Sequence, residues 1–461
     1  MREVAVMKKT EMRLQDAAIR QTNFKEVSLG YTKEEAIREA TRCLNCKNPM
    51  CIKGCPVNIM IPKFIECIKN GNMEEAIKII NESSSLPAVC GRVCPQEKQC
   101  EKYCVKGFKG DAIAIGALER FCADWAIENN YESKVNIIDN NKRIAIIGSG
   151  PSGLSCAYEL RMLGYDVTIY EALHKAGGVL TYGIPEFRLP KSIVQKEIEE
   201  IQNIGVKIIT NVVVGKSISI DELKEKYDAI YLATGAGLPK LMDIKNINAN
   251  GVYSANEILT RVNLMGAYKK ESKTPIKIPK QVYVIGGGNV AFDAARVMKR
   301  LGSSVTIMYH RSEVELPARR DEIKHALEEN INMEFLKNPK EILVDDDYSV
   351  KGLKYVNMVL LDEIDSSNRR CVKETDSYDT VECDMIILAI GTNINDLAFK
   401  DSMIKTTDRG LIQVEGTHTS DESVFAGGDN TTGAATVILA CGAGVRAAKE
   451  IDEYLGGKNE K

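Results

Sequence analysis

The sequence predicts an α/β protein in which a helical N-terminal domain precedes two domains that are each built on a parallel β-sheet. Three observations support this prediction. Ten of the 14 cysteines lie between Cys43 and Cys122, in a sequence with a helical pattern. Further along, an apolar strand followed by a glycine-rich turn and a helix occurs twice. At 461 residues the chain is also long enough for two or three cores.

The composition is that of a globular protein, with 44% hydrophobic and 27% charged residues. A net charge of −3 gives no indication of a nucleic-acid or membrane partner. The first 16 residues lack the apolar core of a signal peptide, and no run approaches the roughly 18 apolar residues of a membrane helix. We therefore expect a cytoplasmic protein, in which structural disulfides are rare.

Residues 1–140 are predicted to form the helical domain. Thr32 and Glu35 in "TKEEAIREATRCL" have the spacing of a capping box at a helix start. The stretch "IPKFIECIKNGNMEEAIKIINESSSLP" predicts two short helices that are separated at Gly71. The cysteines gather in "CLNCKNPMCIKGCP" and "CGRVCPQEKQCEKYC", which predicts two cysteine-rich loops.

The cysteine spacing favours iron–sulfur clusters over zinc or disulfides. Zinc sites prefer two C-x2-C pairs, and only Cys43 and Cys46 form such a pair in these loops. Disulfides are disfavoured by the expected compartment. The run C-x2-C-x4-C-x3-C-P is close to the bacterial ferredoxin pattern, in which the cysteine before the proline binds the other cluster. We therefore predict two [4Fe–4S] clusters.

The same pattern divides the thiols between the two clusters. Cys55 and Cys94 are predicted to share the second cluster, because each precedes a proline. We expect the first cluster at Cys43, Cys46, Cys51 and Cys104, and the second at Cys55, Cys94 and Cys100. The second cluster then lacks one ligand. Cys90 is the obvious candidate, and an oxygen ligand from another helix is the less obvious one.

The first glycine-rich unit, "RIAIIGSGPSGLSCAYELRMLGYDVTIYEA", predicts a dinucleotide site. The strand 144–147 leads into Gly148-x-Gly150-x-x-Gly153, whose glycines permit a tight turn, close approach of a diphosphate, and helix–strand packing. The phosphates meet the positive end of the following helix. Glu171 ends the second strand, 23 residues after Gly148, where a carboxylate binds a ribose hydroxyl. We predict FAD at this unit.

The second unit, "QVYVIGGGNVAFDAARVMKRLGSSVTIMYHRSE", repeats the motif as Gly286-x-Gly288-x-x-Ala291. When the two units are aligned, Tyr309 stands in place of the ribose-binding acid, and Arg311 follows two residues later. A carboxylate repels a 2′-phosphate, whereas a guanidinium binds it through paired hydrogen bonds. We therefore predict NADP(H) here, with NAD(H) as the alternative.

Two further arginines are candidates for the same phosphate. Arg319 and Arg320 follow the second unit in "ELPARRDE". They are at least as well explained by a solvated charged surface.

Three later stretches are typical of a flavoprotein. "YLATGA" and "IILAIGT" are apolar strands that end in a glycine turn. In "VFAGGDNTTGAATVILACGAGVRAAKEI", Gly428 and Asp429 precede a long alanine-rich helix. Asp429 is placed to bind a ribityl hydroxyl, and the helix start around 434–436, including Thr436, to face the flavin O2 edge, where negative charge grows on reduction. The alternative is an ordinary N-capping aspartate.

Along nearly its full length the chain resembles the small (β) subunit of NADPH-dependent glutamate synthase. It is also similar to the large subunit of the electron-bifurcating NADH-dependent ferredoxin:NADP oxidoreductase, to sulfide dehydrogenase α subunits and to the N-terminal half of dihydropyrimidine dehydrogenase. The resemblance is carried by "LGYTKEEAIREATRCLNCKNPMCIKGCPVNIMIPKFI", "CGRVCPQEKQCEKYC", "IGALERF", "GSGPSGL", "GGVLTYGIPEFRLPK", "GGGNVAFDAAR" and "AGGD".

The resemblance implies a fourth ligand for the second cluster and a domain arrangement. It assigns that ligand to Glu119 in "IGALE" and makes Cys90 a non-ligand. It also implies a glutathione-reductase-like pair of domains, in which an NADP domain is inserted into the FAD domain. The predicted bounds are 257–394 for the NADP domain, and 141–256 with 395–461 for the FAD domain. The loop 177–191, which includes Gly178, is expected to lie near the flavin.

We therefore predict an electron-input subunit that oxidises NADPH through FAD and passes electrons through two clusters to a partner. The resemblance implies a larger glutamate synthase subunit as that partner. The alternatives are a small flavin/[2Fe–2S] subunit with ferredoxin, a sulfide dehydrogenase subunit and a pyrimidine-reducing partner. No catalytic acid–base residue is assigned, since hydride transfer to a flavin needs none. Residues 141–461 contain no C-x-x-C pair, which disfavours a disulfide reductase. A zinc-bearing scaffold remains the non-enzymatic alternative.

Overall fold

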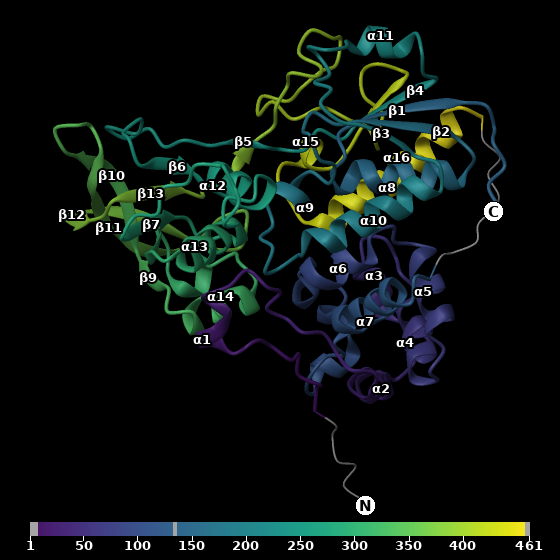
Figure 1. Cartoon of the computed structure of the whole chain (residues 1–461), viewed down its shortest axis with the longest axis horizontal. Coiled ribbons are helices and arrows are strands. Elements are labelled where there is room, and N and C mark those ends of the chain that lie inside the picture. The colour runs from purple at the N-terminus through teal and green to yellow at the C-terminus, as the bar shows by residue number, and fades with distance from the viewer. Residues whose placement is uncertain (1–7, 132–135, 457–461) are drawn as a thin grey trace, which may run out of the picture.

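The computed structural model describes residues 8–131 and 136–456. Within these ranges the chain forms a helical body below a first parallel sheet, with a second parallel sheet to one side (Figure 1). This is the α/β architecture predicted from the sequence. The predicted domains extend into 1–7, 132–135 and 457–461, which lie outside the described residues, and their exact boundaries stay predictions.

The helical body confirms the local signals of the sequence. Thr32 and Glu35 form the predicted capping box, and the chain turns at Gly71 with a φ of 77° between two helices. The helices are α1 (Ala17–Arg20), α2 (Lys33–Thr41), α3 (Met50–Lys53), α4 (Ile61–Lys69), α5 (Met73–Asn81), α6 (Pro87–Val93) and α7 (Ile115–Glu128). Short 3-10 turns, η1 (Gln96–Lys98), η2 (Glu101–Tyr103) and η3 (Val105–Phe108), carry the second cysteine loop.

The first sheet has the strand order β15-β4-β1-β2-β3, with all neighbours parallel. Its strands are β1 (Arg143–Ile147), β2 (Asp166–Tyr170), β3 (Lys207–Ile209), β4 (Ala229–Leu232) and β15 (Val424–Ala426). The helices of this domain are α8 (Pro151–Met162), α9 (Val179–Tyr182), α10 (Lys191–Asn203), α11 (Ile220–Lys224), α15 (Asp429–Thr432) and α16 (Val437–Tyr454). Because β15 comes from the end of the chain, the second sheet is inserted into this domain, as predicted.

The second sheet has the parallel order β6-β13-β7-β8-β9. Its strands are β6 (Val252–Ser254), β7 (Gln281–Ile285), β8 (Ser304–Tyr309), β9 (Asn332–Phe335) and β13 (Met385–Leu388). Around it lie α12 (Ala255–Leu259), η4 (Thr260–Leu264), α13 (Asn289–Leu301), η5 (Glu313–Glu315) and α14 (Arg320–Glu328). The short strands β5 (Leu238–Pro239) and β14 (Thr392–Asn393) pair where the chain enters and leaves this domain.

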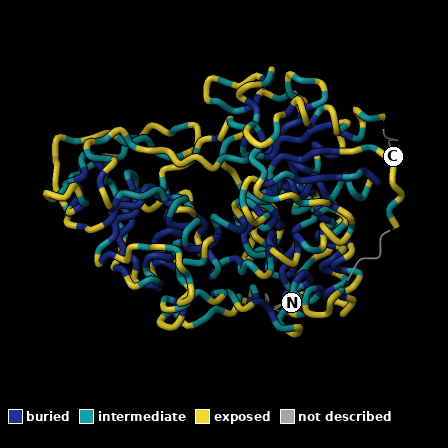
Figure 2. Tube along the Cα trace, turned by 45° about the horizontal axis from the view of Figure 1, so that its top comes forward, coloured by how far each residue is buried: buried dark blue, intermediate teal, exposed yellow. Residues whose placement is uncertain are grey.

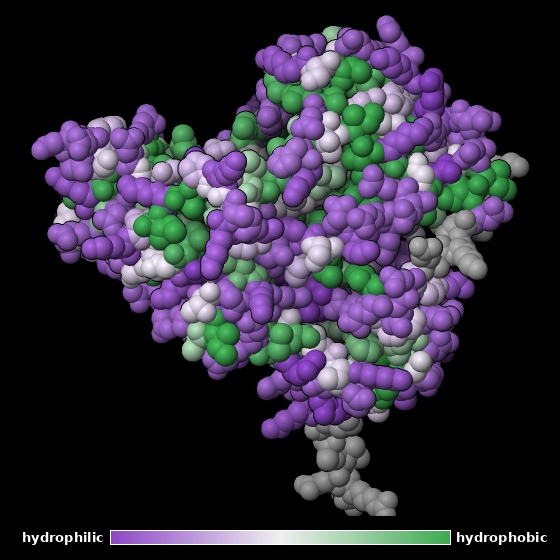
Figure 3. Space-filling view, viewed as in Figure 1, coloured by the Kyte–Doolittle hydropathy of each residue, from purple (hydrophilic) through white to green (hydrophobic). Residues whose placement is uncertain are grey.

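An antiparallel sheet that the sequence analysis did not predict extends the second domain. It consists of β10 (Lys337–Val344), β11 (Val350–Ile364) and β12 (Arg370–Glu382). It forms the lobe at the left of Figure 1, and a notch in the molecular surface separates this lobe from the first-sheet domain (Figure 3).

The helical body and the first-sheet domain share one hydrophobic core. Phe64 and Ile80 from the helices belong to the same buried cluster as Ile146 and Leu160 from the first-sheet domain. Figure 2 shows buried segments in dark blue in both of these parts. The second domain has a core of its own. The chain before α2 contacts this second domain, since Val27 is part of its core. None of the described helices is both long and apolar enough to cross a membrane.

Candidate functional site

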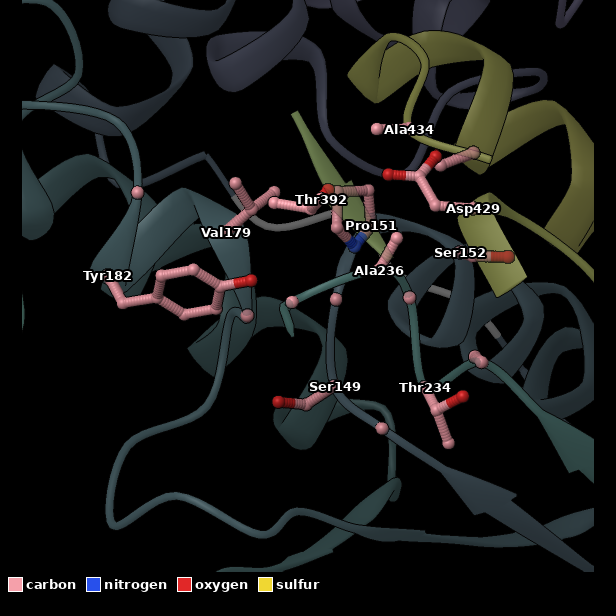
Figure 4. A pocket seen from close by; sticks show the side chains of 18 of the residues that line it. Ser149, Pro151, Ser152, Val179, Tyr182, Thr234, Ala236, Thr392, Asp429 and Ala434 are labelled. Atoms are coloured by element: carbon pink, nitrogen blue, oxygen red, sulfur yellow. The ribbon is translucent and has the colours of Figure 1, made fainter. Parts of the chain in front are cut away.

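A cavity of about 580 Å³ lies where the three bodies meet. The first-sheet domain contributes its glycine turn, the end of β2, the α9 region and the start of α16. Val93 and Pro95 of the helical body line the cavity, as do Asn289 and Asp293 at the start of α13 in the second domain. Figure 4 shows the side chains that surround it. Residues of both nucleotide units and of the cysteine-rich body therefore line the same cavity.

The first glycine turn has the close contacts that its motif predicts. A Cβ on Gly148, whose φ is 104°, would lie 2.5 Å from the carbonyl oxygen of Ala233. A Cβ on Gly153 would lie 2.0 Å from the carbonyl oxygen of Gly148. At Gly150 no atom of the described chain lies within 4 Å of such a Cβ, so the turn is open toward the cavity. The turn at the N-terminus of α8 thus fits a bound diphosphate.

Glu171 lies at the end of β2, as predicted, and lines the cavity. One of its oxygens accepts from the Ser149 backbone N–H at 3.0 Å, and the other accepts from the Leu173 N–H at 2.8 Å. The Ser149 hydroxyl also donates to Glu171 and accepts from the Gly177 N–H at 3.0 Å. Sequence reasoning missed Ser149, although its place inside the glycine motif was a usable signal. Ser149 thus joins the glycine turn to Glu171, the predicted ribose ligand, and to the following loop.

The opposite wall contains Asp429 and the N-terminus of α16. The carboxylate of Asp429 accepts from the Ala435 N–H at 3.2 Å, and burial raises its pKa to about 6. Thr436 caps α16 by accepting from the Leu439 N–H at 3.4 Å. The positive end of this 18-residue helix therefore lies at the cavity, where it stabilises negative charge. The short helix α15 separates Asp429 from α16, a detail that the sequence did not reveal.

Two predicted glycines shape the same walls. Gly178 has a φ of 52°, and a Cβ there would lie 2.9 Å from the Cα of Gly150. Gly428 has a φ of 82° and lies against Ser152, whose Cβ a side chain at 428 would approach to 3.0 Å. Both positions therefore favour glycine for steric reasons.

Four of the predicted cluster thiols line a second, smaller cavity. They are Cys43, Cys46, Cys51 and Cys104. Burial, with the nearby Cys104 and Cys43, raises the pKa of Cys51 to about 11. The structure thus brings together the residues predicted for the first cluster, and Cys104 joins them from the second loop.

Cys55, Cys94, Cys100 and Glu119 form the second predicted group. Burial raises the pKa of the Cys55 thiol to about 11, and the nearby Glu119 adds to this rise. Burial, with Glu101, Glu119 and Cys55 nearby, also raises the pKa of the Cys100 thiol. Cys55 of the first loop therefore lies near Cys100 and Glu119, whereas Cys104 of the second loop lies with the first group.

Glu119 is a buried carboxyl group whose Oε1 atom has no hydrogen-bond partner among the described residues. Its side chain is on α7, and the residue is 6% exposed. Burial alone raises its pKa to about 8. Burying a carboxyl group without a partner is unfavourable, so this site suits a positively charged ligand such as iron.

The chemistry of these donor sets fits [4Fe–4S] clusters. Across the described ranges, no three or more His, Cys, Asp or Glu side chains are close enough to hold one metal ion. Each ligand of a four-iron cluster binds a different iron atom, so a cluster does not require that spacing. The ligand assignments themselves stay predictions.

The second thiol group lies next to the large cavity. Val93 and Pro95, on either side of Cys94, line that cavity. Gln99, which precedes Cys100, donates from Nε2 to the Thr436 hydroxyl at 3.4 Å. By contrast, no described residue that lines the small cavity of the first thiol group also lines the large cavity.

The second glycine turn resembles the first. Gly286 has a φ of 141°, and a Cβ there would lie 2.4 Å from the carbonyl oxygen of Ala389. Ala291 is fully buried in α13, as expected for the third position of the motif. Gly288 is open, because a Cβ added there would have no described atom within 4 Å. The turn therefore leaves room for a diphosphate at the start of α13.

Arg311 lies just past the end of β8 and is already ion-paired. Its Nη2 lies 2.6 Å from Asp365 of the β11–β12 connection, while its buried Nε lacks a hydrogen-bond partner within the described part of the chain. Arg369 and Arg370 lie nearby, because Arg369 donates to the Tyr309 hydroxyl at 3.4 Å and Arg370 pairs with Glu315. Sequence reasoning missed both, because the antiparallel sheet that delivers them was not predicted.

Arg319 differs from both sequence interpretations. It is 8% exposed, and its guanidinium donates to Gln96 Oε1 at 3.0 Å and lies 3.5 Å from Glu97. It therefore contacts the helical body rather than a phosphate or solvent. Arg320 is exposed.

A buried ionic cluster joins the second domain to the rest of the chain. Arg188, in the loop after α9, donates to both oxygens of Asp293 at 2.8 and 2.7 Å. We call the following set the arginine–glutamate cluster: Arg20, Arg188, Asp293, Arg296, Arg300, Glu322 and Glu329. Two of its members come from outside the second domain, one from α1 and one from the loop after α9. The others come from α13, from α14 and from the residue that follows α14. The cluster therefore holds the second domain against the rest of the chain.

Comparisons with known proteins identify the family. Residues 20–131 match the model described as dihydropyrimidine dehydrogenase domain II, 4Fe-4S cluster, and residues 142–444 match pyridine nucleotide-disulphide oxidoreductase. The glutamate synthase [NADPH] small chain of Escherichia coli is 33% identical over 448 residues, which cover 95% of both chains. The chain belongs to the glutamate synthase small-chain family.

Other family relatives carry this module within longer chains. The NADP(+)-dependent formate dehydrogenase subunit beta of Moorella thermoacetica is 38% identical over 88% of this chain and 60% of its own length. FprA of Mycobacterium tuberculosis, solved in complex with NADPH, matches 68% of this chain and 84% of its own with a TM-score of 0.59. At 19% identity, FprA shows the fold alone.

The family and the fold define the general activity. The protein is an NADPH-oxidising flavoprotein oxidoreductase that transfers electrons, and its cofactors are FAD, [4Fe–4S] clusters and NADP(H). Its family relatives are subunits of larger complexes.

Proposed function

We propose that the protein is the electron-input subunit of an NADPH-dependent glutamate synthase. NADPH is oxidised at the large cavity, and electrons leave through the second and then the first cluster to a larger subunit. The order of electron transfer is supported by Val93 and Pro95, the sequence neighbours of Cys94, which both line the large cavity. Alignment along 94–95% of three glutamate synthase small chains supports the choice of partner.

The flavin, when bound, converts two-electron oxidation of NADPH into single-electron transfer, and the clusters carry single electrons. The chain's residues hold and orient these groups. The turn at Gly148–Gly150 binds the diphosphate, Glu171 accepts from the ribose and Asp429 accepts from the ribityl chain. The N-terminus of α16 stabilises the negative charge that appears on reduction. No side chain has to move a proton for hydride transfer.

We assign Glu119 as the fourth ligand of the second cluster. Its unpartnered oxygen and its proximity to Cys55, Cys94 and Cys100 support this assignment. Cys90 is the competing candidate, since its buried thiol contacts Cys94 of the group as well as Cys441. An oxygen ligand changes the cluster's potential, because ligand type is one of its determinants.

Replacing Glu119 tests this assignment. Anaerobically purified protein should contain about eight irons per chain, as two four-iron clusters. Glu119→Ala should change the electron paramagnetic resonance signal of one reduced cluster and leave the other unaltered. Glu119→Gln, which keeps an oxygen donor, should have the smaller effect.

Cys90→Ser is the matched control for the Glu119 variants. Cys90 is as buried as Glu119 and lies in the same region, yet we expect both cluster signals to persist in Cys90→Ser. If Cys90→Ser alters one cluster while Glu119→Ala alters neither, the fourth ligand is the thiol.

We assign the second nucleotide site to NADP(H), with Arg311 as the residue that binds the 2′-phosphate. The unpartnered Nε of Arg311 and the neighbouring Arg369 support an anion site at the end of β8. Arg311→Ala should raise the KM for NADPH about tenfold or more, since hydrogen bonds between charged groups contribute about 1.5–3 kcal/mol.

Steady-state kinetics with NADPH and NADH check the Arg311 prediction. Arg320→Ala, at an exposed position close in sequence, serves as the control and should change neither KM. An equal loss with both nucleotides in Arg311→Ala would contradict a 2′-phosphate contact and favour NAD(H).

A second candidate is an electron-transfer subunit that serves a different acceptor. The formate dehydrogenase beta subunit and the NADPH-Fe(3+) oxidoreductase subunit beta of Geobacter sulfurreducens are 38% and 36% identical. Anaerobic co-purification from the native cell separates the candidates. A large glutamate synthase subunit supports the first proposal, and a small flavin/[2Fe–2S] subunit supports a bifurcating ferredoxin:NADP oxidoreductase.

A further inference from the structure

A short turn connects β11 to β12 in the antiparallel lobe of the second domain, and we call its residues 365–369 the hairpin turn. Its backbone is fixed from within, because the Asp365 N–H donates to the Arg369 carbonyl oxygen at 2.8 Å and Asn368 has a φ of 58°. The Oδ1 atom of Asp365 also accepts from the backbone N–H groups of Ser367 at 2.8 Å and of Arg369 at 3.2 Å. The hairpin turn is therefore an ordered element of the domain.

Two charged side chains of the hairpin turn contact the end of β8, where the 2′-phosphate is predicted to bind. Asp365 Oδ2 accepts from Arg311 Nη2 at 2.6 Å, and Arg369 Nη1 donates to the Tyr309 hydroxyl at 3.4 Å. Tyr309 occupies the position of the ribose-binding acid in the second glycine-rich unit. Burial, with Arg311 and Arg369 nearby, lowers the pKa of His310. Both guanidinium groups are thus close to the end of β8.

The charges at this position are unequally paired. Arg370 lies 2.6 Å from Glu315, and Arg311 lies 2.6 Å from Asp365. Arg369, in contrast, forms no ion pair within the described part of the chain. Arg311 also keeps one buried donor, its Nε atom, without a partner among residues 8–131 and 136–456. The end of β8 therefore carries a net positive charge and a donor that suits an anion.

Asp365 and a 2′-phosphate are both anions that bind a guanidinium group. A hydrogen bond from Ser367 is the main cause that lowers the pKa of Asp365, and Arg311 adds to the effect. The carboxylate is therefore charged at neutral pH. Two anions beside one guanidinium repel each other, so a phosphate that binds Arg311 weakens its pair with Asp365. A nucleotide that lacks the 2′-phosphate leaves the pair intact.

We propose, on the basis of the NADP(H) site proposed above, that the hairpin turn sets the strength of the 2′-phosphate contact. Arg369 is a second guanidinium for this phosphate, and Asp365 competes with the phosphate for Arg311. NADP(H) gains contacts with two guanidinium groups at the cost of part of one ion pair, whereas NAD(H) gains and loses neither. The competition keeps the affinity for NADP⁺ moderate, which favours release of the oxidised nucleotide.

Asp365 has one alternative role, which is to anchor the hairpin turn to β8 through Arg311. The two roles predict opposite signs. Removing an anchor loosens Arg311 and weakens the binding of a 2′-phosphate, whereas removing a competitor frees Arg311 and strengthens that binding. Asp365→Asn separates the two roles, because asparagine keeps the Oδ1 acceptor that the turn needs and loses the charge.

The test is equilibrium binding of two probes that differ only by the 2′-phosphate. Adenosine 2′,5′-bisphosphate and adenosine 5′-phosphate are titrated into the oxidised holoprotein by isothermal titration calorimetry. The variants are Asp365→Asn, Arg369→Ala and Arg369→Lys. Their matched controls are Asp362→Asn on β11 and Lys373→Ala on β12, both at exposed positions.

We expect Arg369→Ala to weaken the binding of adenosine 2′,5′-bisphosphate about tenfold, because a hydrogen bond between charged groups is lost. Arg369→Lys should have a smaller effect, since lysine keeps the charge without the planar fork. Asp365→Asn should strengthen the binding of the bisphosphate about fivefold or more, because it removes the competing charge. None of these variants should change the binding of adenosine 5′-phosphate, and both controls should match the wild type.

Each contrary result has a defined meaning. A wild type that prefers the bisphosphate, with binding unchanged in both Arg369→Ala and Asp365→Asn, would overturn the role of the hairpin turn alone. Weaker binding of the bisphosphate to Asp365→Asn would make Asp365 an anchor and remove the competition. Changes of equal size in the controls would also overturn the proposal. A wild type that binds both probes equally would instead refute the NADP(H) assignment on which the proposal rests.

Discussion

Glu329→Gln should destabilise the second domain by about 3–5 kcal/mol, the cost of breaking a buried ion pair. Glu329 is fully buried and accepts hydrogen bonds from Arg20, Arg296 and Arg300. Glutamine keeps the shape but removes the negative charge that three buried guanidinium groups share. Arg20 then keeps only Glu328 and Arg296 keeps only Glu322, while Arg300 loses the carboxylate with which it pairs. Differential scanning calorimetry should show the thermal midpoint of this domain lowered by about 10 °C or more.

The arginine–glutamate cluster also makes this stability sensitive to acid. Burial opposes the effect, but Arg188 and Arg296 lower the pKa of Glu322 from 4.5 to about 2. A folded-state pKa below the unfolded value means that the stabilisation is present above pH 4.5 and is lost as the pH falls toward 2. Unfolding of the wild type should show this loss between those values.

The exposed Glu313 of the same domain provides the matched control. Glu313→Gln should leave both the thermal midpoint and the acid profile at wild-type values. A Glu329→Gln protein as stable as this control would mean that the cluster contributes little to the fold.

Gly153→Val should abolish FAD binding. Even a single Cβ at this position would lie 2.0 Å from the carbonyl oxygen of Gly148, so the turn and α8 cannot keep their present separation. Displacing the turn removes the backbone N–H groups that bind the diphosphate. The flavin released on denaturation, measured by fluorescence, should fall from about one per chain toward zero.

Gly110→Ala is the control for the glycine turn. Gly110 is exposed, and no described atom lies within 4 Å of a Cβ added there. This variant should keep its full flavin content. A Gly153→Val protein that retains flavin at the wild-type ratio would contradict the placement of the diphosphate at this turn.

Local patterns in the sequence predicted much of the fold and the placement of the site. The capping box at Thr32, the break at Gly71 and both glycine turns depend on residues that are close in sequence, and the structure reproduces all of them. The predicted division of the thiols also came from spacing, because Cys55 and Cys94 each precede a proline, as does the crossing cysteine of the ferredoxin pattern. The prediction that Glu119 is a ligand needed the family resemblance, since nothing in its helix sequence distinguishes a ligand from a solvated residue.

Contacts between distant segments were not predictable in this way. Three hydrogen bonds illustrate this: Arg311 to Asp365, Arg319 to Gln96 and Arg20 to Glu329. The two partners of each bond are 54 to 309 positions apart in the sequence. A charged residue looks the same in the sequence whether its partner is solvent or a buried carboxylate. The β10–β12 sheet was missed for a related reason, because β12 is largely exposed and has little apolar alternation.

The loop that carries Cys94 and Cys100 contributes to two sites: its cysteines belong to the second thiol group, and Val93 and Pro95 line the large cavity. Its Gln99 also donates a hydrogen bond to Thr436 at the start of α16. Whatever orders this loop from one side also orders it for the other, so we expect assembly of the predicted second cluster and uptake of the flavin to be thermodynamically linked. Maturation of the protein should then be cooperative, and iron shortage should reduce the supply of flavin-loaded enzyme as well as that of its clusters.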